Sequence, residues 1–462
     1  MLKRRVLPVL CLALVVGAQG AMAASTRDTM PETMDMLQHA IAFKTVKGEG
    51  QIQPFAEYLA TKLKSAGFTD ADIEIIPIEG SAGMIVTYKG STPEQPFFIA
   101  AHMDVVPAPH ADKWHSDPFK LTERDGYLYG RGAADMKSKL IAVVSTFMRL
   151  KREGFVPKRT MILQLSGGEE AGPNTTREMI RRSPKPEFML NAESGGGIYN
   201  GQLQPVLYTV QAAEKTYADF TLEAISPGGH SSQPQPAKNA INRMAKALDH
   251  IATYRFPAQA DEITRGFLRA TGEHEQGAVA RAMVAFAKNP KDQQAADVLY
   301  ADPAYIGQIG TTCIATMMSA GQARNALPQD ATANVNCRIF PGVSVESVQA
   351  TLTRLVDDPS ITITARHGPV TPPSPLVPAL MEAVAATVHE RFPGVAVAPA
   401  MSAGATDGKY YREAGIPSYG VDSTFSKPDD ERMHGVDERI LAREIPASLD
   451  FWHSLLTRLG GK

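Results

Sequence analysis

The most chemically suggestive stretch of this chain, residues 101–137, begins with His-x-Asp and ends with Gly-Arg-Gly-x-x-Asp. It supplies an imidazole at His102 and carboxylates at Asp104 and Asp135. Nitrogen and carboxylate oxygen are donors that suit a borderline divalent ion such as zinc. The apolar run 95–100 predicts a buried strand before His102, and open α/β sheets place ligands at such strand ends. The stretch therefore predicts the first half of a metal site.

Asp104 has a predicted role separate from that of a metal ligand. If the chain stays extended, His102 and Asp104 point to one face, so the Asp104 carboxylate can accept a hydrogen bond from the second imidazole nitrogen. A His-x-Asp triplet also arises by chance in a chain of 462 residues. The triplet therefore has meaning only if other ligands join it.

Further candidate ligands follow apolar runs elsewhere in the chain. The run 160–166 leads to Glu169 and Glu170, and the run 187–192 leads to Glu193. A Glu-Glu pair alone is more typical of a solvated loop, because glutamate is rarely buried without a partner. Glu193 follows an apolar strand and precedes a glycine run, which makes a surface role harder to accept. His434, a lone histidine, gains significance only from the rest.

The order of predicted elements indicates the fold class. Asp135 directly precedes residues 136–150, whose apolar residues recur at helical spacing, and a helix N-terminus favours a carboxylate. Strands that alternate with helices predict an α/β unit with a mostly parallel sheet between helices. Near residue 211 the pattern changes to α+β, with predicted strands 217–225, 312–318 and 332–340, a helix 239–254 and a long helical stretch 261–299. We therefore predict a catalytic domain, residues 24–211 and 367–462, with an inserted domain, residues 212–366.

The composition excludes some partners. The formal net charge is -2 and no long charge run is present, so neither nucleic acid nor an anionic membrane surface is indicated. Residues 1–23 combine basic residues, a short apolar run and Ala-Met-Ala, which is typical of a cleaved signal peptide. The apolar run is shorter than the roughly 20 residues of a spanning helix, which disfavours a retained anchor. We expect a periplasmic or secreted protein with no membrane contact after cleavage.

The predicted mature chain has two cysteines, Cys313 and Cys337, on either side of the turn-rich segment 319–330. A hairpin centred near Asn325 would permit a cross-strand disulfide in an oxidising compartment. Because disulfide geometry is strict, we expect two independent buried thiols instead.

The candidate residues occur in the motifs HMDVVP, GRGAADMKSK, GGEEAG, NAE and ERMHGVDE. Their order and settings resemble the di-zinc exopeptidase and amidohydrolase family that contains glutamate carboxypeptidase, acetylornithine deacetylase, succinyl-diaminopimelate desuccinylase, aminoacylase and carboxypeptidase S. The resemblance covers nearly the whole mature chain. It implies a zinc-exopeptidase-like catalytic domain with an inserted α+β lid and dimerisation domain.

The resemblance also implies two zinc ions and their ligands, with Co²⁺ or Mn²⁺ as alternatives. It implies that His102 and Glu193 bind one ion, that Glu170 and His434 bind the other, and that Asp135 bridges both. Two metal ions about 3.5 to 4 Å apart can activate a water molecule and polarise a carbonyl, and a bridging carboxylate must reach both.

Catalytic roles beyond the ligands follow from the same resemblance. Glu169 would be the general base that takes a proton from the metal-bridging water, and Asp104 would orient His102. In SPGGHSSQP, His230 would stabilise the developing oxyanion, across a subunit interface in dimeric members of the family.

The remaining matches to the family concern the substrate. Asn325 and Arg338 match positions that hold it, and a guanidinium suits a carboxylate. The segment SAGATDG resembles the family's Gly-rich loop beside the substrate carboxylate. Where the family typically has two glycines, this chain has Ala403 and Gly404, so Gly404 would let the backbone approach the substrate closely. Glutamate at position 193 is typical of the carboxypeptidases and aminoacylases of the family, which indicates a free α-carboxylate on the leaving amino acid.

We therefore expect a metallopeptidase of carboxypeptidase or dipeptidase type that cleaves the amide bond next to a C-terminal amino acid. Its substrate would be a small peptide or an N-acyl amino acid. An N-acyl-amino-acid deacylase is the alternative. A non-catalytic metal-dependent binding protein is a third hypothesis, since a fold does not determine a function, but the presence of Glu169 argues against it.

Overall fold

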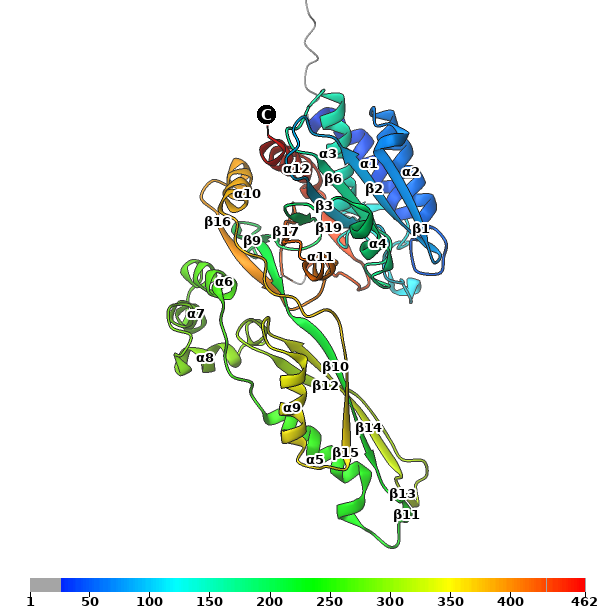
Figure 1. Ribbon diagram of the computed structural model, residues 1–462, viewed down its shortest axis with the longest axis vertical. Helices are drawn as coiled ribbons and strands as arrows, with labels where there is room; N and C mark the ends of the chain where they lie inside the picture. Colours follow the sequence, from blue (N-terminus) through cyan, green and yellow to red (C-terminus); the bar gives the residue numbers. More distant parts are fainter. Residues whose placement is uncertain (1–25, 429, 462) are drawn as a thin grey trace, which may run out of the picture.

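Figure 1 shows the computed structural model, in which residues 26–428 and 430–461 are described. The predicted signal peptide, residues 1–23, lies outside the described residues. Within the described part, no helix has both the length and the apolar character needed to cross a membrane.

A ten-stranded sheet forms the upper part of the molecule in Figure 1. Its central strands β6, β3, β7 and β17 run parallel, whereas antiparallel pairs flank them. This confirms the predicted α/β class with a mostly parallel central sheet. In spatial order the strands are β1 (Ile73–Ile78), β2 (Ser81–Tyr88), β6 (Met161–Ser166), β3 (Phe97–His102), β7 (Met189–Asn191), β17 (Ser418–Gly420), β9 (Pro205–Glu214), β8 (Gly196–Tyr199) and β18 (Phe425–Ser426), with β16 (Ala396–Ser402) paired to β9.

Helices cover both faces of this sheet, which explains why its central strands read as continuous apolar runs. In β3, Phe97 and Ile99 belong to a core on one face, and Phe98 belongs to the core on the other. The first core is closed by α1 (Thr26–Ala42), α2 (Ile52–Ser65), α3 (Lys137–Arg152), α10 (Pro378–Arg391) and α12 (Glu444–Gly460). The second is closed by α4 (Asn174–Arg182) and α11 (Gly408–Glu413).

A second, antiparallel sheet lies in the lower part of Figure 1, with the strand order β12 (Thr312–Ala320), β14 (Asp330–Ile339), β10 (Thr216–Ile225) and β15 (Ile361–His367). Alternate residues of β10 are buried, as expected for a sheet with one covered face. The covering helices are α5 (Ala240–Thr253) and α9 (Val345–Val356). Lys215 alone separates β9 of the large sheet from β10 of this one.

The predicted helical stretch 261–299 is three helices, α6 (Glu262–His274), α7 (Ala278–Lys288) and α8 (Gln293–Tyr300). Gly277, with a φ of 102°, and Pro290 interrupt the helical pattern. Helix α6 packs on β16 and β9 of the large sheet, where a Cβ at Gly266 would lie 2.8 Å from Pro399. These helices leave edge strand β12 exposed, with Ile314 67% and Met317 72% accessible.

The expectation of two independent thiols is wrong. Cys313 and Cys337 form a disulfide between β12 and β14. The strand register places the two residues directly opposite each other, with their Cα atoms 4.1 Å apart. The pairing of β12 with β14 brings the two side chains together, and the positions of the cysteines in the sequence do not by themselves determine that pairing.

Candidate metal centre and catalytic site

The candidate ligands lie at the same end of three neighbouring parallel strands. His102 is the last residue of β3, Glu169 and Glu170 follow the end of β6, and Glu193 follows β7. Because β6, β3 and β7 are adjacent in the sheet, residues distant in sequence meet at one edge. Asp135 reaches this edge from the segment before α3, as predicted.

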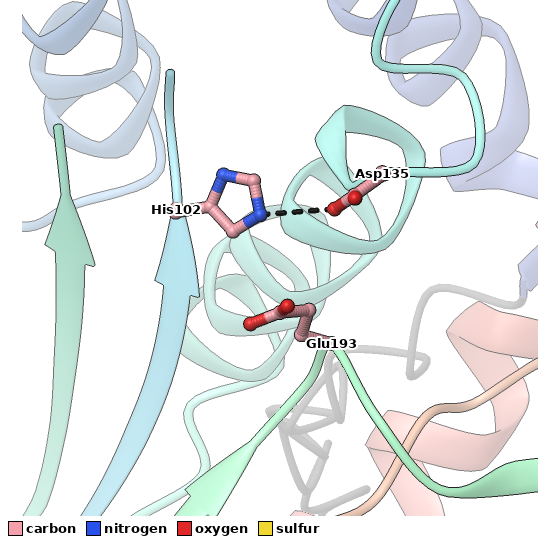
Figure 2. A group of neighbouring side chains, drawn as sticks. All are labelled: His102, Asp135 and Glu193. Carbon is pink, nitrogen blue, oxygen red and sulfur yellow. Dashed lines mark hydrogen bonds and ion pairs between the residues drawn. The ribbon is translucent and has the colours of Figure 1, made fainter. Parts of the chain in front are cut away.

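Asp135 occupies the centre of the cluster and uses both carboxylate oxygens. Its Oδ1 lies 3.0 Å from Nε2 of His102, and its Oδ2 lies 3.1 Å from Nε2 of His434. The same His434 nitrogen lies 2.9 Å from Oε1 of Glu170. Figure 2 shows His102, Asp135 and Glu193 directed toward one another.

Three overlapping triplets could each hold a metal ion, because their ligand atoms lie within 4.8 Å of one another. The triplets share His102, Asp135 and Glu170, so they form one continuous cluster rather than separate sites. They are His102 with Asp135 and Glu193, His102 with Glu169 and Glu170, and Asp135 with Glu170 and His434.

The electrostatics of the cluster fit a bound cation. Burial raises the pKa of Glu193 to about 8. Hydrogen bonds with Asp135 and Glu170 raise the pKa of His434 to about 10. Carboxylates gathered in a desolvated site need positive charge to stay ionised, and divalent cations supply it at a site built of imidazole and carboxylate groups. The donor set therefore fits divalent metal ions.

The predicted contact between Asp104 and His102 differs in detail. Nδ1 of His102 lies 2.9 Å from the backbone carbonyl of Asp104 and 3.6 Å from its carboxylate oxygen Oδ1. The buried carboxylate instead accepts hydrogen bonds from the backbone N–H groups of Glu169 (3.1 Å) and Glu170 (3.0 Å). The reason is that the loop after β6 lies beside the end of β3, so the backbone N–H groups of this loop can donate to the Asp104 carboxylate. Asp104 thus connects His102 to the Glu-Glu segment.

Two functional residues were missed from the sequence although both lie within the recognised motifs. Glu438 is fully buried and forms an ion pair with Arg131. Its Oε1 accepts hydrogen bonds from the backbone N–H groups of Gly132, Ala134 and Asp135. Arg131 also donates to the backbone carbonyl of His434 at 3.3 Å. This pair therefore joins the Asp135 segment to the His434 segment. The available signal in the sequence was that Arg131 lies in the motif of Asp135 and Glu438 in the motif of His434.

Glu169 differs from Glu170 in its surroundings. Its carboxylate forms no hydrogen bond or ion pair among the described residues, whereas Glu170 contacts His434. Burial, followed by the charge of nearby Glu193, raises the pKa of Glu169 well above its ordinary range. A carboxyl group whose pKa is raised is a stronger proton acceptor than an ordinary exposed carboxylate, as a general base requires.

Two cavities adjoin the cluster. One, of about 520 Å³, includes Asp135, Glu193 and Glu431, and the other, of about 620 Å³, includes Lys215 and Arg338. Glu169, Glu170, Gly404, Ala405 and His434 line both. The two cavities are therefore two arms of one cleft that meet at the candidate ligands.

The basic arm contains two predicted substrate residues, Arg338 and Gly404, and one residue that was missed, Lys215. Arg338 lies over the ring of Tyr217 and donates to the carbonyl of Ala403 at 3.1 Å. Lys215, at the junction of β9 and β10, is 2% accessible, and its burial, followed by the charge of Arg338, lowers its pKa to about 7. Neither residue forms an ion pair within the described part of the chain. The tertiary junction, which the sequence pattern does not reveal, places Lys215 there.

His230 and Asn325 lie away from this cleft. His230 is in β11 (Gly229–His230), which pairs with β13 (Ala326–Leu327) directly after Asn325. Figure 1 places β11 and β13 at the far end of the second sheet. His230 is exposed, and its Nδ1 lies 2.7 Å from Oγ of Ser232. Within one chain, the structure therefore brings together the predicted ligands, Asp104, Glu169, Arg338 and Gly404, but not these two residues.

Comparisons with known proteins find relatives that match most of this chain. The chain is 27% identical over 377 residues to the N-fatty-acyl-amino acid synthase/hydrolase PM20D1.1 of Danio rerio, covering 78% of this chain and 72% of that protein. It is 25% identical over 458 residues to the probable carboxypeptidase S-like 2 of Dictyostelium discoideum, covering 92% and 84%. The M20 family metallo-carboxypeptidase Sso-CP2 of Sulfolobus solfataricus shares the fold, with a TM-score of 0.71 and 16% identity over 93% of this chain and 99% of that chain.

The family predicted from the sequence motifs is confirmed by a match that spans most of the chain. Residues 98–458 match Peptidase family M20/M25/M40, and this region contains all the candidate ligands. The chain belongs to the M20/M25/M40 peptidase family and is a metallopeptidase or amidohydrolase.

Proposed function

We propose that this protein is an exported di-metal hydrolase that releases a C-terminal amino acid from a dipeptide, a short peptide or an N-acyl amino acid. The observation that carries the proposal is the meeting of two imidazoles and four carboxylates at three neighbouring strand ends, beside a basic cavity. The carboxypeptidase S-like relative supports it.

The proposed ligand roles follow the contacts of the cluster. His102 and Glu193 would hold one ion and Glu170 and His434 the other, while Asp135, which faces both imidazoles, would bridge them. We propose zinc, with Co²⁺ or Mn²⁺ as alternatives, since imidazole and carboxylate ligands suit all three. When bound, such a pair of ions supplies Lewis-acid polarisation of the amide carbonyl and activation of a water molecule.

Glu169 is the proposed general base. It lines both arms of the cleft, has no competing side-chain partner among the described residues, and is adjacent to a ligand. Its carboxylate would take the proton of the attacking water and deliver it to the leaving nitrogen. Asp104 and Glu438 would act as positioning residues, because they hold the backbone of Glu169, Glu170 and Asp135.

The basic arm is the proposed site of the substrate's C-terminal carboxylate. Arg338 and Lys215 are neighbouring basic side chains without a carboxylate partner in the described part of the chain, and a bound carboxylate would favour the charged form of Lys215. Gly404 lines the same arm, where a Cβ would meet only Oγ of Ser402, at 3.3 Å, so a substrate can approach its backbone closely. A carboxylate would pair with the guanidinium of Arg338 through charge-assisted hydrogen bonds.

We propose that His230 and Asn325 reach the cleft of a second copy in a homodimer. Edge strand β12 supports this, because no other described strand pairs with its outer side and it exposes Ile314, Met317 and Met318. Sedimentation velocity tests the proposal, and a monomer at micromolar concentration would contradict it.

Export rests on the predicted signal peptide, and N-terminal sequencing of the mature protein would test the predicted cleavage after Ala23.

Deacylation of N-acyl amino acids is the second candidate activity, and the N-fatty-acyl-amino acid synthase/hydrolase relative favours it. Assays with dipeptides and with N-acetyl and N-succinyl amino acids separate the two activities. Inactivity on every dipeptide would refute the peptidase proposal.

Glu169→Gln tests the mechanism. The variant keeps the shape of the side chain and removes its basicity, so we expect about 10²- to 10⁴-fold lower kcat with both metal ions retained. Metal content by plasma emission spectrometry, measured on the same sample as dipeptide hydrolysis, provides the control. Wild-type turnover in the variant would exclude the assigned role.

A further inference from the structure

The two arms of the cleft carry opposite charge. The basic arm contains Lys215, Arg338 and Lys409, and its carboxylate Glu214 is neutralised by Arg412 at 2.7 Å. The other arm, which we call the acidic arm, contains Asp135, Glu193, Asp422 and Glu431 around a single lysine, Lys139. A substrate that lies across the candidate ligands therefore has one end in positive and the other in negative surroundings.

Most of the negative charge in the acidic arm is already compensated. Lys139 forms an ion pair with Asp422 at 2.7 Å, and both side chains are buried. The four carboxylates nearest the proposed metal ions, those of Asp135, Glu169, Glu170 and Glu193, match the charge of two divalent cations. Lys139 is the only lysine or arginine among the described residues that line this arm, and it stands between two carboxylates, its ion-pair partner Asp422 and the nearby Glu431, so this part of the arm keeps a net negative charge.

Glu431 also lacks a hydrogen-bonding partner. Among the described residues, its carboxylate forms neither a hydrogen bond nor an ion pair, although its backbone carbonyl accepts a hydrogen bond from the N–H of Arg439. The side chain lines the cavity and is only partly accessible, and burial raises its pKa to about 7. A half-buried carboxylate without a protein partner is costly unless a ligand supplies one.

We propose that Glu431 binds the free α-ammonium group of the substrate, so that the preferred substrates are unblocked dipeptides or short peptides rather than N-acyl amino acids. The inference rests on the proposed function, because it takes the carboxylate end to lie in the basic arm and the scissile amide to lie beside Glu169. A dipeptide is a zwitterion whose charges match the two arms. An N-acyl amino acid has only the negative charge and would leave Glu431 unpaired.

The test compares substrates that differ only in the α-amine. L-alanyl-L-leucine and N-propanoyl-L-leucine have the same carbon skeleton, and the second lacks the amine. The pair is assayed with metal-loaded wild type, Glu431→Gln and the control Glu123→Gln, which changes an exposed carboxylate on β4 (Thr122–Arg124). Matched pairs with phenylalanine, glutamate or lysine as the second residue cover side-chain preference.

We expect wild type to favour the dipeptide over its propanoyl counterpart by about 10- to 100-fold in kcat/KM, the range of a hydrogen bond between charged groups. Glu431→Gln should lose about the same factor on dipeptides and keep its kcat/KM for propanoyl substrates within about 2-fold, since only dipeptides use that hydrogen bond. Glu123→Gln should behave as wild type on both.

The outcomes separate the two proposals. If wild type cleaves neither class of substrate, the proposed function fails. If wild type cleaves both classes and Glu431→Gln lowers both equally, the inference about the α-amine is overturned while the hydrolase proposal stands. Loss of one metal ion from Glu431→Gln would also overturn the inference, because it would make Glu431 a ligand.

Discussion

The hydrogen bonds of Asp104 lead to a quantitative prediction for the substitution Asp104→Asn. In the wild type, the buried carboxylate accepts hydrogen bonds from two backbone amides, those of Glu169 at 3.1 Å and Glu170 at 3.0 Å. Asparagine has one oxygen, without charge, and its NH₂ group would face the other amide. A hydrogen bond to a charged group contributes about 1.5 to 3 kcal/mol. Losing one such bond and weakening the other should lower the free energy of unfolding by about 2 to 4 kcal/mol.

The assay is urea unfolding of the metal-free protein, combined with zinc titration of the folded protein. Because Asp104 holds the segment that carries Glu170, we expect about 10- to 100-fold weaker metal binding as well, as for other residues that support metal ligands. Asp112→Asn is the matched control, since Asp112 is an exposed aspartate in the same connecting segment. Equal unfolding free energies for the two variants, within about 0.5 kcal/mol, would refute the role of Asp104.

Two further predictions concern stability away from the ligands. Replacing both Cys313 and Cys337 by alanine should lower the free energy of unfolding by about 3 kcal/mol, because the bond closes a loop with a sequence separation of 24 residues. Dithiothreitol should lower the stability of the wild type and leave that of the variant unchanged. Equal sensitivity of the two proteins to dithiothreitol would contradict the disulfide. Lys215, with its pKa lowered to about 7, is neutral in the folded state above that pH while the unfolded state still binds its proton up to its ordinary pKa of 10.5. The contribution of Lys215 to the free energy of unfolding therefore rises between pH 7 and pH 10. In urea unfolding, Lys215→Met should be more stable than the wild type at pH 7, and this difference should shrink by on the order of 1 kcal/mol per pH unit as the pH rises. Parallel pH profiles of the two proteins would count against a buried Lys215 with a lowered pKa.

Several parts of the fold could be predicted from local patterns. The apolar runs before His102 and Glu193 are strands β3 and β7, and the helical spacing after Asp135 is α3. The stretch 261–299 was correctly predicted as helical, but its division into three helices was not predicted. Its breaks lie at Gly277 and Pro290, which the prediction treated as part of one polar helical stretch. The pairing of Cys313 with Cys337 depends on strand register, which these cysteines do not determine by themselves.

The supporting residues of the site show where sequence reasoning ends. Glu438 and Arg131 lie in motifs that were recognised, yet the ion pair between them joins segments about 300 residues apart in the sequence. Lys215 carries no motif, Glu431 opens the recognised motif that contains His434, and each matters because of what surrounds it in space. His230 and Asn325 stay predictions for a second copy, since β11 and β13 lie far from the cleft in one chain.

The sequence by itself determined the family, the α/β class and the types of residue available for a metal site, because strand-forming runs and ligand motifs are local properties. Only the tertiary structure decided which of these residues meet, since convergence depends on β6, β3 and β7 being parallel neighbours. It also decided that Asp104 anchors the Glu169–Glu170 backbone and that the cleft has a basic and an acidic arm. Burial and charge balance depend on the whole surroundings of a group, so they exist only once the chain has folded.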